Sequence, residues 1–329
     1  MSAKLGFHVS ISGGISNSVD NALKVGCSAF QIFTRNPRGW AAKPLQEEDV
    51  INFRKKLAES NIDRNSIFVH MPYLPNLSSS NTILHKKSTQ VLAEELQRSS
   101  ALGISYVVLH LGKHSEKDKN IGINQLVKAC NNAFQNYYKS SSSSSPPTRL
   151  AAKKKKDSSS HASSKGTPTL LLENSAGEKN SIGSKFDELG LILDKLRSSD
   201  SSHHSNKASS FSICLDTCHA FAAGYDLRTS DVVNETLDKF SMEVGLKNLK
   251  LVHLNDSKDK LNSNRDRHEH IGLGNIGKEG FRELLNHKSI KKLPIIMEIP
   301  VDSKRDDSDN LKVVLDLLDN KKERTRKKK

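Results

Sequence analysis

The chain alternates short apolar runs with longer amphipathic segments, and several of the runs end in a histidine or a carboxylate. Short apolar runs indicate buried strands, whereas apolar residues spaced three and four apart indicate helices. We expect strands at residues 4–9, 29–34, 67–71, 106–111, 169–173, 212–216, 249–254 and 294–299. We expect the clearest helices at residues 47–60, 81–102, 120–138, 230–243, 278–286 and 309–319. This alternation predicts an α/β fold.

Eight predicted strands separated by helical segments fit a closed barrel better than an open sheet. Nearly every predicted strand is apolar, and none has the polar character of a sheet edge. The sequence therefore predicts a single (β/α)8 TIM barrel over residues 1–319, followed by a basic disordered tail at residues 320–329. In this fold the active site forms at the C-terminal face of the strands, where residues far apart in the sequence meet.

Two serine-rich stretches, the first of them also rich in lysine, interrupt the pattern at about residues 139–166 and 198–210. Such stretches contain too few apolar side chains to offset the entropy lost when a chain is ordered. We interpret them as disordered insertions. Because the strand count stays at eight without them, they do not mark domain boundaries.

Nine histidines and carboxylates lie at or just beyond the ends of the predicted strands. They are His70, His110, Glu173, Asp216, His219, His253, Asp266, His268 and Glu298. Burying so many ionisable groups is costly unless cations pair with them. Imidazoles with carboxylates suit zinc, manganese or iron, and nine ligands are too many for one four-coordinate ion. The pattern therefore predicts two or three divalent ions that share a bridging carboxylate at the C-terminal face.

Two further histidines, His8 and His114, also follow predicted strands. A single histidine in such a place is more often a hydrogen-bonded structural residue than a ligand, and either one could support a ligand through a hydrogen bond. We do not include them in the metal set. Cys218 is a rival ligand beside His219, but a lone thiol among oxygen and nitrogen donors is better interpreted as a packing residue, as is Cys214.

The four cysteines, at positions 27, 130, 214 and 218, form no regular framework, so we expect free thiols and a reducing compartment. No apolar run approaches the roughly 20 residues needed to span a bilayer. The first predicted strand begins near Lys4, which leaves no room for a cleavable signal. These features predict an intracellular protein without a membrane partner.

The formal net charge of +14 is concentrated in two stretches. The last nine residues, KKERTRKKK, hold seven bases, and residues 153–156 are four lysines. Together they account for about ten of the fourteen charges, so the rest of the chain is only mildly basic. We interpret the tail as a segment that contacts polyanions or a nuclear import factor. The nucleus is the expected location, with the cytoplasm and a mitochondrial pool left open.

Nine sequence strings together resemble the endonuclease IV family of apurinic/apyrimidinic (AP) endonucleases. They are GFHVSISGG, QIFTRNPRGW, VHMPYLPNLSS, LHLGKH, LLENSAG, LDTCHAFAAGYD, VHLNDSK, DRHEHIGLGNIG and MEIP, in the order of the family. The resemblance covers nearly the whole chain apart from the insertions and the tail. It implies an enzyme of base excision repair that cuts DNA on the 5′ side of abasic sites, leaves a 3′-OH and a 5′-deoxyribose phosphate, and trims blocked 3′ ends.

The resemblance also implies three zinc ions, one of which manganese or iron could replace. His70 and His110 would hold the first ion, and Glu173 would bridge it to the second. The other ligands of the second ion would be Asp216, His253 and Glu298, and those of the third would be His219, Asp266 and His268. Such ions would neutralise a phosphodiester and lower the pKa of a bound water towards about 7.

The candidate catalytic residues are Glu298 and the bridging Glu173. We expect the second carboxylate oxygen of Glu298 to be free, so that it orients or deprotonates the attacking water. By resemblance, the residues inserted into bent duplex DNA are Arg38, Tyr73 and Leu74. A monomer is expected for a barrel that reaches around DNA.

Two other classes of function stay open at the level of the sequence. A sugar isomerase or epimerase on a similar barrel would hold one or two divalent ions, leaving His219, Asp266 and His268 without a role. A non-catalytic DNA-binding protein or scaffold would act through the basic tail alone.

Overall fold

The computed structural model describes residues 3–115, 118–143, 166–199 and 210–319, and within these ranges eight parallel strands close into one barrel. The barrel strands are β1 (Lys4–His8), β2 (Ala29–Ile32), β3 (Ile67–His70), β4 (Tyr106–His110), β5 (Thr169–Glu173), β6 (Phe211–Asp216), β7 (Leu249–His253) and β10 (Pro294–Met297). Each strand pairs with the next along the chain, and β10 closes the ring against β1. The predicted TIM barrel is confirmed, with strand ends displaced by two residues at most.

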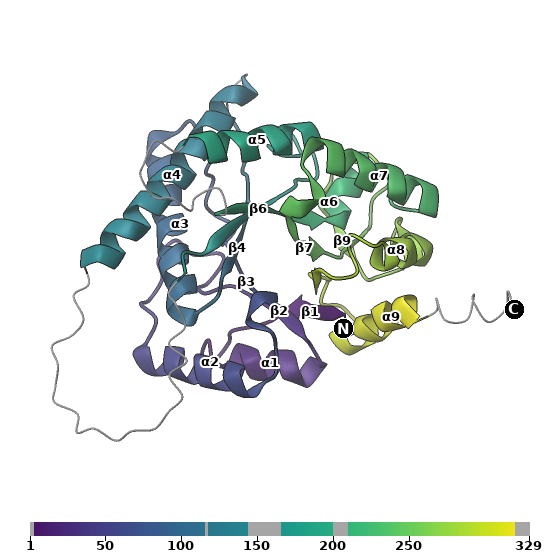
Figure 1. The fold of residues 1–329 in the computed structure, drawn as a ribbon, viewed down its shortest axis with the longest axis horizontal. Coiled ribbons are helices and arrows are strands. Elements are labelled where there is room, and N and C mark those ends of the chain that lie inside the picture. The colour runs from purple at the N-terminus through teal and green to yellow at the C-terminus, as the bar shows by residue number, and fades with distance from the viewer. Residues whose placement is uncertain (1–2, 116–117, 144–165, 200–209, 320–329) are drawn as a thin grey trace, which may run out of the picture.

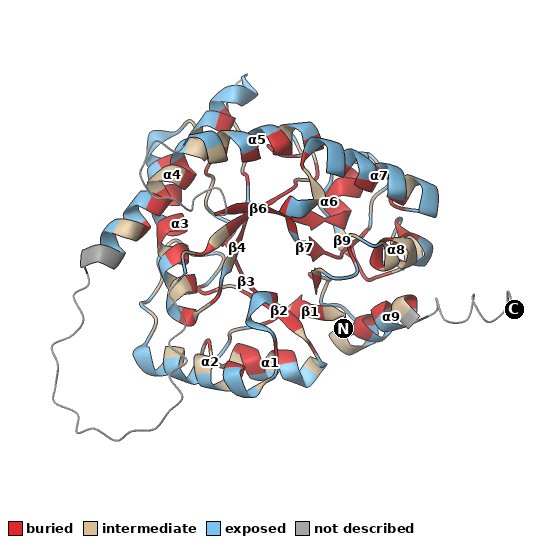
Figure 2. Ribbon diagram, in the orientation of Figure 1, coloured by how far each residue is buried: buried red, intermediate tan, exposed pale blue. Residues whose placement is uncertain are grey.

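Helices surround the barrel and place their apolar sides against the strands (Figures 1 and 2). They are α1 (Asn17–Val25), α2 (Glu47–Glu59), α3 (Thr82–Leu102), α4 (Lys119–Ser143), α5 (Phe186–Ser198), α7 (Ser230–Glu243), α8 (Gly277–Asn286) and α9 (Asp307–Asp319). The six predicted helices are confirmed, and α1 and α5 complete the ring. Three small elements interrupt the loops at the carboxyl ends of β6 and β7: helix α6 (Thr217–Ala222) and the antiparallel strands β8 (Asp256–Ser257) and β9 (His268–Glu269).

Helix α4 corrects one predicted boundary. It continues to Ser143, so the first insertion does not begin as disordered chain at residue 139. The second predicted insertion likewise overlaps the end of α5 at Ser198. Most of both insertions, and the tail at residues 320–329, lie outside the described residues.

The predicted free thiols are confirmed, because all four cysteines are unpaired and buried. Among the helices that the structure describes, none combines the length and apolar character needed to cross a membrane.

A small apolar cluster fills the middle of the barrel, apart from the larger core between strands and helices. Its fully buried members are Ala29, Phe68, Val108, Leu171, Cys214, Leu251 and Ile296, one from each of seven strands. Side chains two residues apart on a strand point the same way. The residue two positions after each member therefore also faces inward, one layer nearer the C-terminal face. This layer carries the polar site.

Gly6 is the β1 position in the layer of the apolar cluster, paired with Ala29 of β2. A Cβ atom at Gly6 would lie only 1.7 Å from the main-chain oxygen of Ala29. Glycine is therefore required for β1 and β2 to approach as closely as they do.

Candidate metal centre

The structure brings all nine predicted ligands together at the C-terminal face of the barrel. Five are the last residues of β3 to β7, and Glu298 directly follows β10. His219 lies on α6, while Asp266 and His268 come from the loop that contains β9. Their ligand atoms form three groups in which every pair of atoms lies within 4.8 Å. The groups are His70, His110 and Glu173; Glu173, Asp216, His253 and Glu298; and His219, Asp266 and His268.

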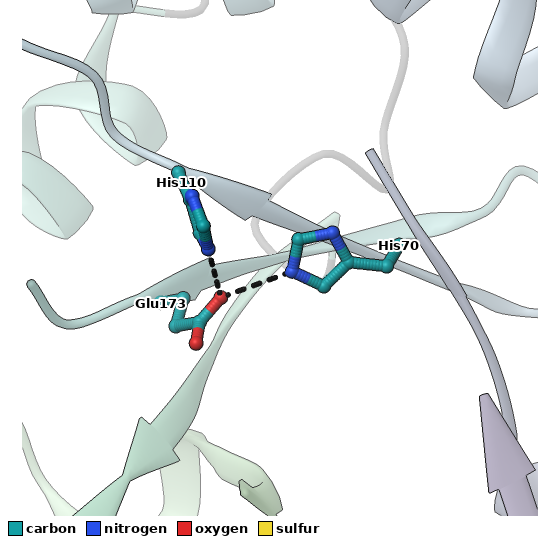
Figure 3. A group of neighbouring side chains, drawn as sticks. All are labelled: His70, His110 and Glu173. Atoms are coloured by element: carbon teal, nitrogen blue, oxygen red, sulfur yellow. Dashed lines mark hydrogen bonds and ion pairs between the residues drawn. The ribbon is translucent and has the colours of Figure 1, made fainter. Parts of the chain in front are cut away.

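The first group joins β3, β4 and β5 (Figure 3). The Nε2 atoms of His70 and His110 lie 3.2 and 3.1 Å from the same oxygen, Oε2 of Glu173. Glu173 is almost fully buried, so its charge is shielded little by water. Two imidazole nitrogens and one carboxylate oxygen therefore face a common point.

The second group uses the other oxygen of Glu173. Its Oε1 lies 3.1 Å from Nδ1 of His253, and that nitrogen lies 3.2 Å from Oε2 of Glu298. The Oδ2 atom of Asp216 is 3.9 Å from the same nitrogen. Because its two oxygens face different groups, Glu173 has the placement that a bridging carboxylate requires.

The third group contains two ring nitrogens that a cation would satisfy. Nε2 of His219 and Nε2 of His268 each lie 3.1 Å from Oδ1 of Asp266. Both nitrogens are buried and have no hydrogen-bond partner. A buried polar atom without a partner is costly, so these two nitrogens fit a bound ion better than an empty space.

Main-chain carbonyls set the tautomer of three of the histidines. Nδ1 of His70 lies 2.6 Å from the carbonyl oxygen of Met71. Nδ1 of His219 lies 2.9 Å from that of Asn174, and Nδ1 of His268 lies 2.7 Å from that of Glu298. When Nδ1 donates its proton to a carbonyl, the lone pair on Nε2 is directed into the site.

Three buried amides that the sequence analysis did not identify support the centre. Asn174 accepts from the main-chain N–H of Asp216 at 2.7 Å. Asn255 donates to Oδ2 of Asp216 at 2.6 Å and accepts from the main-chain N–H of Glu298 at 2.8 Å. The third, Gln31, lies two positions after Ala29 on β2, so the inward alternation of the strand is the sequence signal that could have found it.

The second oxygen of Glu298 is not free, contrary to our expectation. Its Oε1 accepts a hydrogen bond of 2.6 Å from the amide of Gln31. Nδ1 of His8 lies 3.4 Å from the same oxygen, so His8 is near the centre as a supporting residue, whereas His114 belongs to none of the groups found among the described residues.

Cys218 and a separate cluster offer poorer sites than the three groups. Burial, followed by the charge of Asp216, raises the pKa of the Cys218 thiol, which disfavours the thiolate that binds metals. Cys214 packs in the middle of the barrel. His270, in the cluster with Glu269 and Asp302, already pairs with Asp302 at 2.8 Å.

The predicted DNA-contacting residues lie at the rim of the site. Tyr73 and Leu74 are exposed and line a pocket that also contains His110, Glu173 and Asp266. Arg38 is exposed on the loop after β2, and this loop meets the loop of Tyr73 through a 3.1 Å hydrogen bond from the Tyr73 N–H to the Pro37 carbonyl.

Comparison with known proteins decides which barrel family this is. Residues 19–321 match the family model of the xylose isomerase-like TIM barrel. A curated relative, "Probable endonuclease 4" of Cenarchaeum symbiosum, is 47% identical over 309 residues, which are 94% of this chain and 97% of the relative. The chain belongs to the endonuclease IV family.

A solved structure of endonuclease IV from Thermus thermophilus agrees with this assignment. It is 30% identical, with a TM-score of 0.75 over 96% of this chain and 99% of its own. A D-tagatose 3-epimerase-like protein has a TM-score of 0.64 at 16% identity, a likeness that shows the shared barrel alone.

In the metal centre of this endonuclease IV family member, histidines and carboxylates shift each other's pKa values. Burial opposes charge on His268, but the nearby carboxylates of Asp266 and Asp216 raise its pKa to about 9. Burial likewise opposes charge on His219, yet Asp216 and Asp266 raise its pKa well above the usual value. In Glu173 burial is outweighed by His110 and His253, which hold its pKa well below the usual value. Without metal the centre is therefore an array of ion pairs that bound cations would replace.

The raised histidine pKa values predict that zinc binding strengthens as the pH rises. Below about 9, the proton on His268 competes with the ion. Because the pKa of His219 is also raised, its proton competes with the ion as well. We expect zinc affinity to rise between about pH 6 and pH 8, by up to about tenfold per pH unit for each proton displaced. Competition with a chelator, corrected for the chelator's own protonation, measures this. An affinity that is constant over this range would contradict the assigned charges.

Proposed function

We propose that this chain is a DNA-repair hydrolase that cleaves the phosphodiester 5′ to abasic sites in duplex DNA with three zinc ions. The observation that carries the proposal is the division of nine ligands into three groups linked by Glu173. Family membership supports the nuclease reaction and DNA as the substrate, since the relatives at 35–47% identity have the name endonuclease 4. The products would be a 3′-OH and a 5′-deoxyribose phosphate, and the same site would trim blocked 3′ ends.

Each group has a defined part in holding the ions. Glu173 would join the first and second ions, because its Oε2 faces His70 and His110 while its Oε1 faces His253. Zinc held there would withdraw charge from a phosphodiester and make water acidic enough at neutral pH to supply the nucleophile. Manganese or iron also fits this donor set, so one of the ions could differ.

Glu298 remains the second candidate catalytic residue, with a narrower role than the sequence predicted. Its Oε1 is held by Gln31, and its Oε2 faces the second group. A carboxylate held at both oxygens is suited to orienting the attacking water rather than to rotating towards it as a base. No covalent enzyme intermediate is needed for the proposed hydrolysis.

The rim residues would recognise the damaged nucleotide. The ring centroid of Tyr73 lies 6.4 Å from those of both His70 and His110, and its side chain is 58% exposed. An abasic gap lowers the cost of unstacking, so an exposed aromatic next to the centre can fill it. Leu74 and Arg38 would enter the duplex beside it, which bends the DNA over the site.

Substitution of Asp266 separates the nuclease from a sugar isomerase. In the nuclease Asp266→Asn removes a charged ligand of the third ion, and we expect zinc per chain to fall from near three to near two and nicking to fall by at least about 100-fold. The assay is nicking of a duplex with one synthetic abasic site, without added magnesium. Asp231→Asn, at the exposed start of α7, is the control. Unchanged zinc content and nicking would refute the three-ion proposal. A zinc-loaded wild-type chain that does not nick the duplex would favour the isomerase alternative.

Substitution of Tyr73 tests damage recognition. Because Tyr73 is exposed, we expect Tyr73→Ala to leave zinc content and the melting temperature unchanged. Loss of one stacking ring corresponds to about 1–3 kcal/mol, or roughly 5- to 150-fold weaker binding of abasic duplex. Ile83→Ala, an exposed apolar residue on α3, is the matched control. If binding of abasic and intact duplex changed equally, Tyr73 would have no part in recognition.

Deletion of residues 321–329 tests nuclear import. We propose that this basic tail recruits an import factor to a protein that acts as a monomer in the nucleus. A fluorescent fusion of the full chain should gather in the nucleus, and the shortened fusion should not. Nicking at low salt should survive the deletion, because the metal ligands lie in the barrel. Loss of all DNA binding with the tail would favour the scaffold interpretation.

A further inference from the structure

Gln31 contacts two candidate metal ligands at once from an inward position on β2. Its side chain is fully buried. Its Oε1 lies 2.9 Å from Nε2 of His253, and its Nε2 lies 2.6 Å from Oε1 of Glu298. His8, its partner in register on β1, places Nδ1 3.0 Å from the same amide nitrogen.

The neighbours of Gln31 determine which way its amide faces. The carboxylate of Glu298 can only accept hydrogen bonds, so the amide NH2 group must face it. The amide oxygen then faces Nε2 of His253, which must carry the proton of that hydrogen bond. A flipped amide would place two oxygens together at Glu298.

In this arrangement His253 points the opposite ring nitrogen into the site from the other histidines of the centre. His70, His219 and His268 face main-chain carbonyls with Nδ1 and point Nε2 into the site. His253 uses its Nε2 for Gln31 and points Nδ1 at Glu173 and at Oε2 of Glu298. The main chain fixes the first three, whereas a replaceable side chain fixes His253.

We propose that Gln31 is a positioning residue of the second ion site, an inference that rests on the proposed zinc-dependent function. Its amide oxygen holds His253 in the tautomer that leaves Nδ1 free to bind, and its amide nitrogen holds Glu298 so that Oε2 faces the same ion. One side chain thereby aligns ligands from β7 and from the end of β10. Gln31 touches no reacting atom in this role.

The test compares zinc release from loaded proteins. Gln31→Met keeps a side chain of similar length but loses both hydrogen bonds. We expect one of the three ions to leave about 10- to 100-fold faster under a chelator, the range for loss of an outer hydrogen bond to a ligand. Gln31→Glu keeps the acceptor for His253 but sets a carboxylate against Glu298, so it should also release one ion faster. Gln97→Met is the matched control and should behave as wild type, because the amide of Gln97 is exposed and donates to Ser140, away from the centre.

A second measurement keeps the proposal testable if Gln31→Met does not fold. Nitrogen NMR of the zinc-loaded wild-type chain, with labelled histidine, should place the His253 proton on Nε2 and the ion on Nδ1. The opposite assignment, or wild-type zinc release from folded Gln31→Met, would overturn the role of Gln31. A wild-type chain that binds no zinc would instead refute the proposed function itself.

Discussion

The buried carboxylate of Glu173 is the contact on which the whole centre depends. It lies at the end of β5, and its two oxygens face imidazoles from β3, β4 and β7. An ionised group so deeply buried is stable only if positive charge surrounds it on both sides. The barrel supplies that charge by bringing histidines from several strands to one rim, and divalent ions would supply it more strongly. Formation of the site therefore depends on the fold, because the ligands meet only if the barrel closes.

The alternation of strand side chains connects the core to the chemistry. Phe68, Val108 and Leu171 pack in the middle of the barrel, and His70, His110 and Glu173 follow them at a spacing of two. A shift in register by one residue would turn the ligands towards the helices. The packing that stabilises the barrel thus also makes the ligand side chains point inward.

Sequence patterns predicted the barrel and the meeting of nine candidate ligands at its C-terminal face, because both depend on local signals. Apolar runs mark β1 to β7 and β10, and His253 or Glu298 at a strand end is conspicuous. The supporting amides were harder to predict, since Gln31, Asn174 and Asn255 are uncharged residues whose roles depend on contacts across the barrel. The boundary near residue 139 was also wrong, because composition predicted disorder in a stretch that prolongs α4. The expected free oxygen of Glu298 was wrong for the first reason, because Gln31 holds that oxygen from across the barrel.

Glu298 belongs to two groups through different parts of the same residue. Its carboxylate faces the second group, while its main-chain carbonyl accepts the proton of His268 in the third. A small tilt of the peptide after β10 would therefore disturb both groups together, and neither could be retuned alone. Residue 298 therefore couples the geometry of the second and third groups.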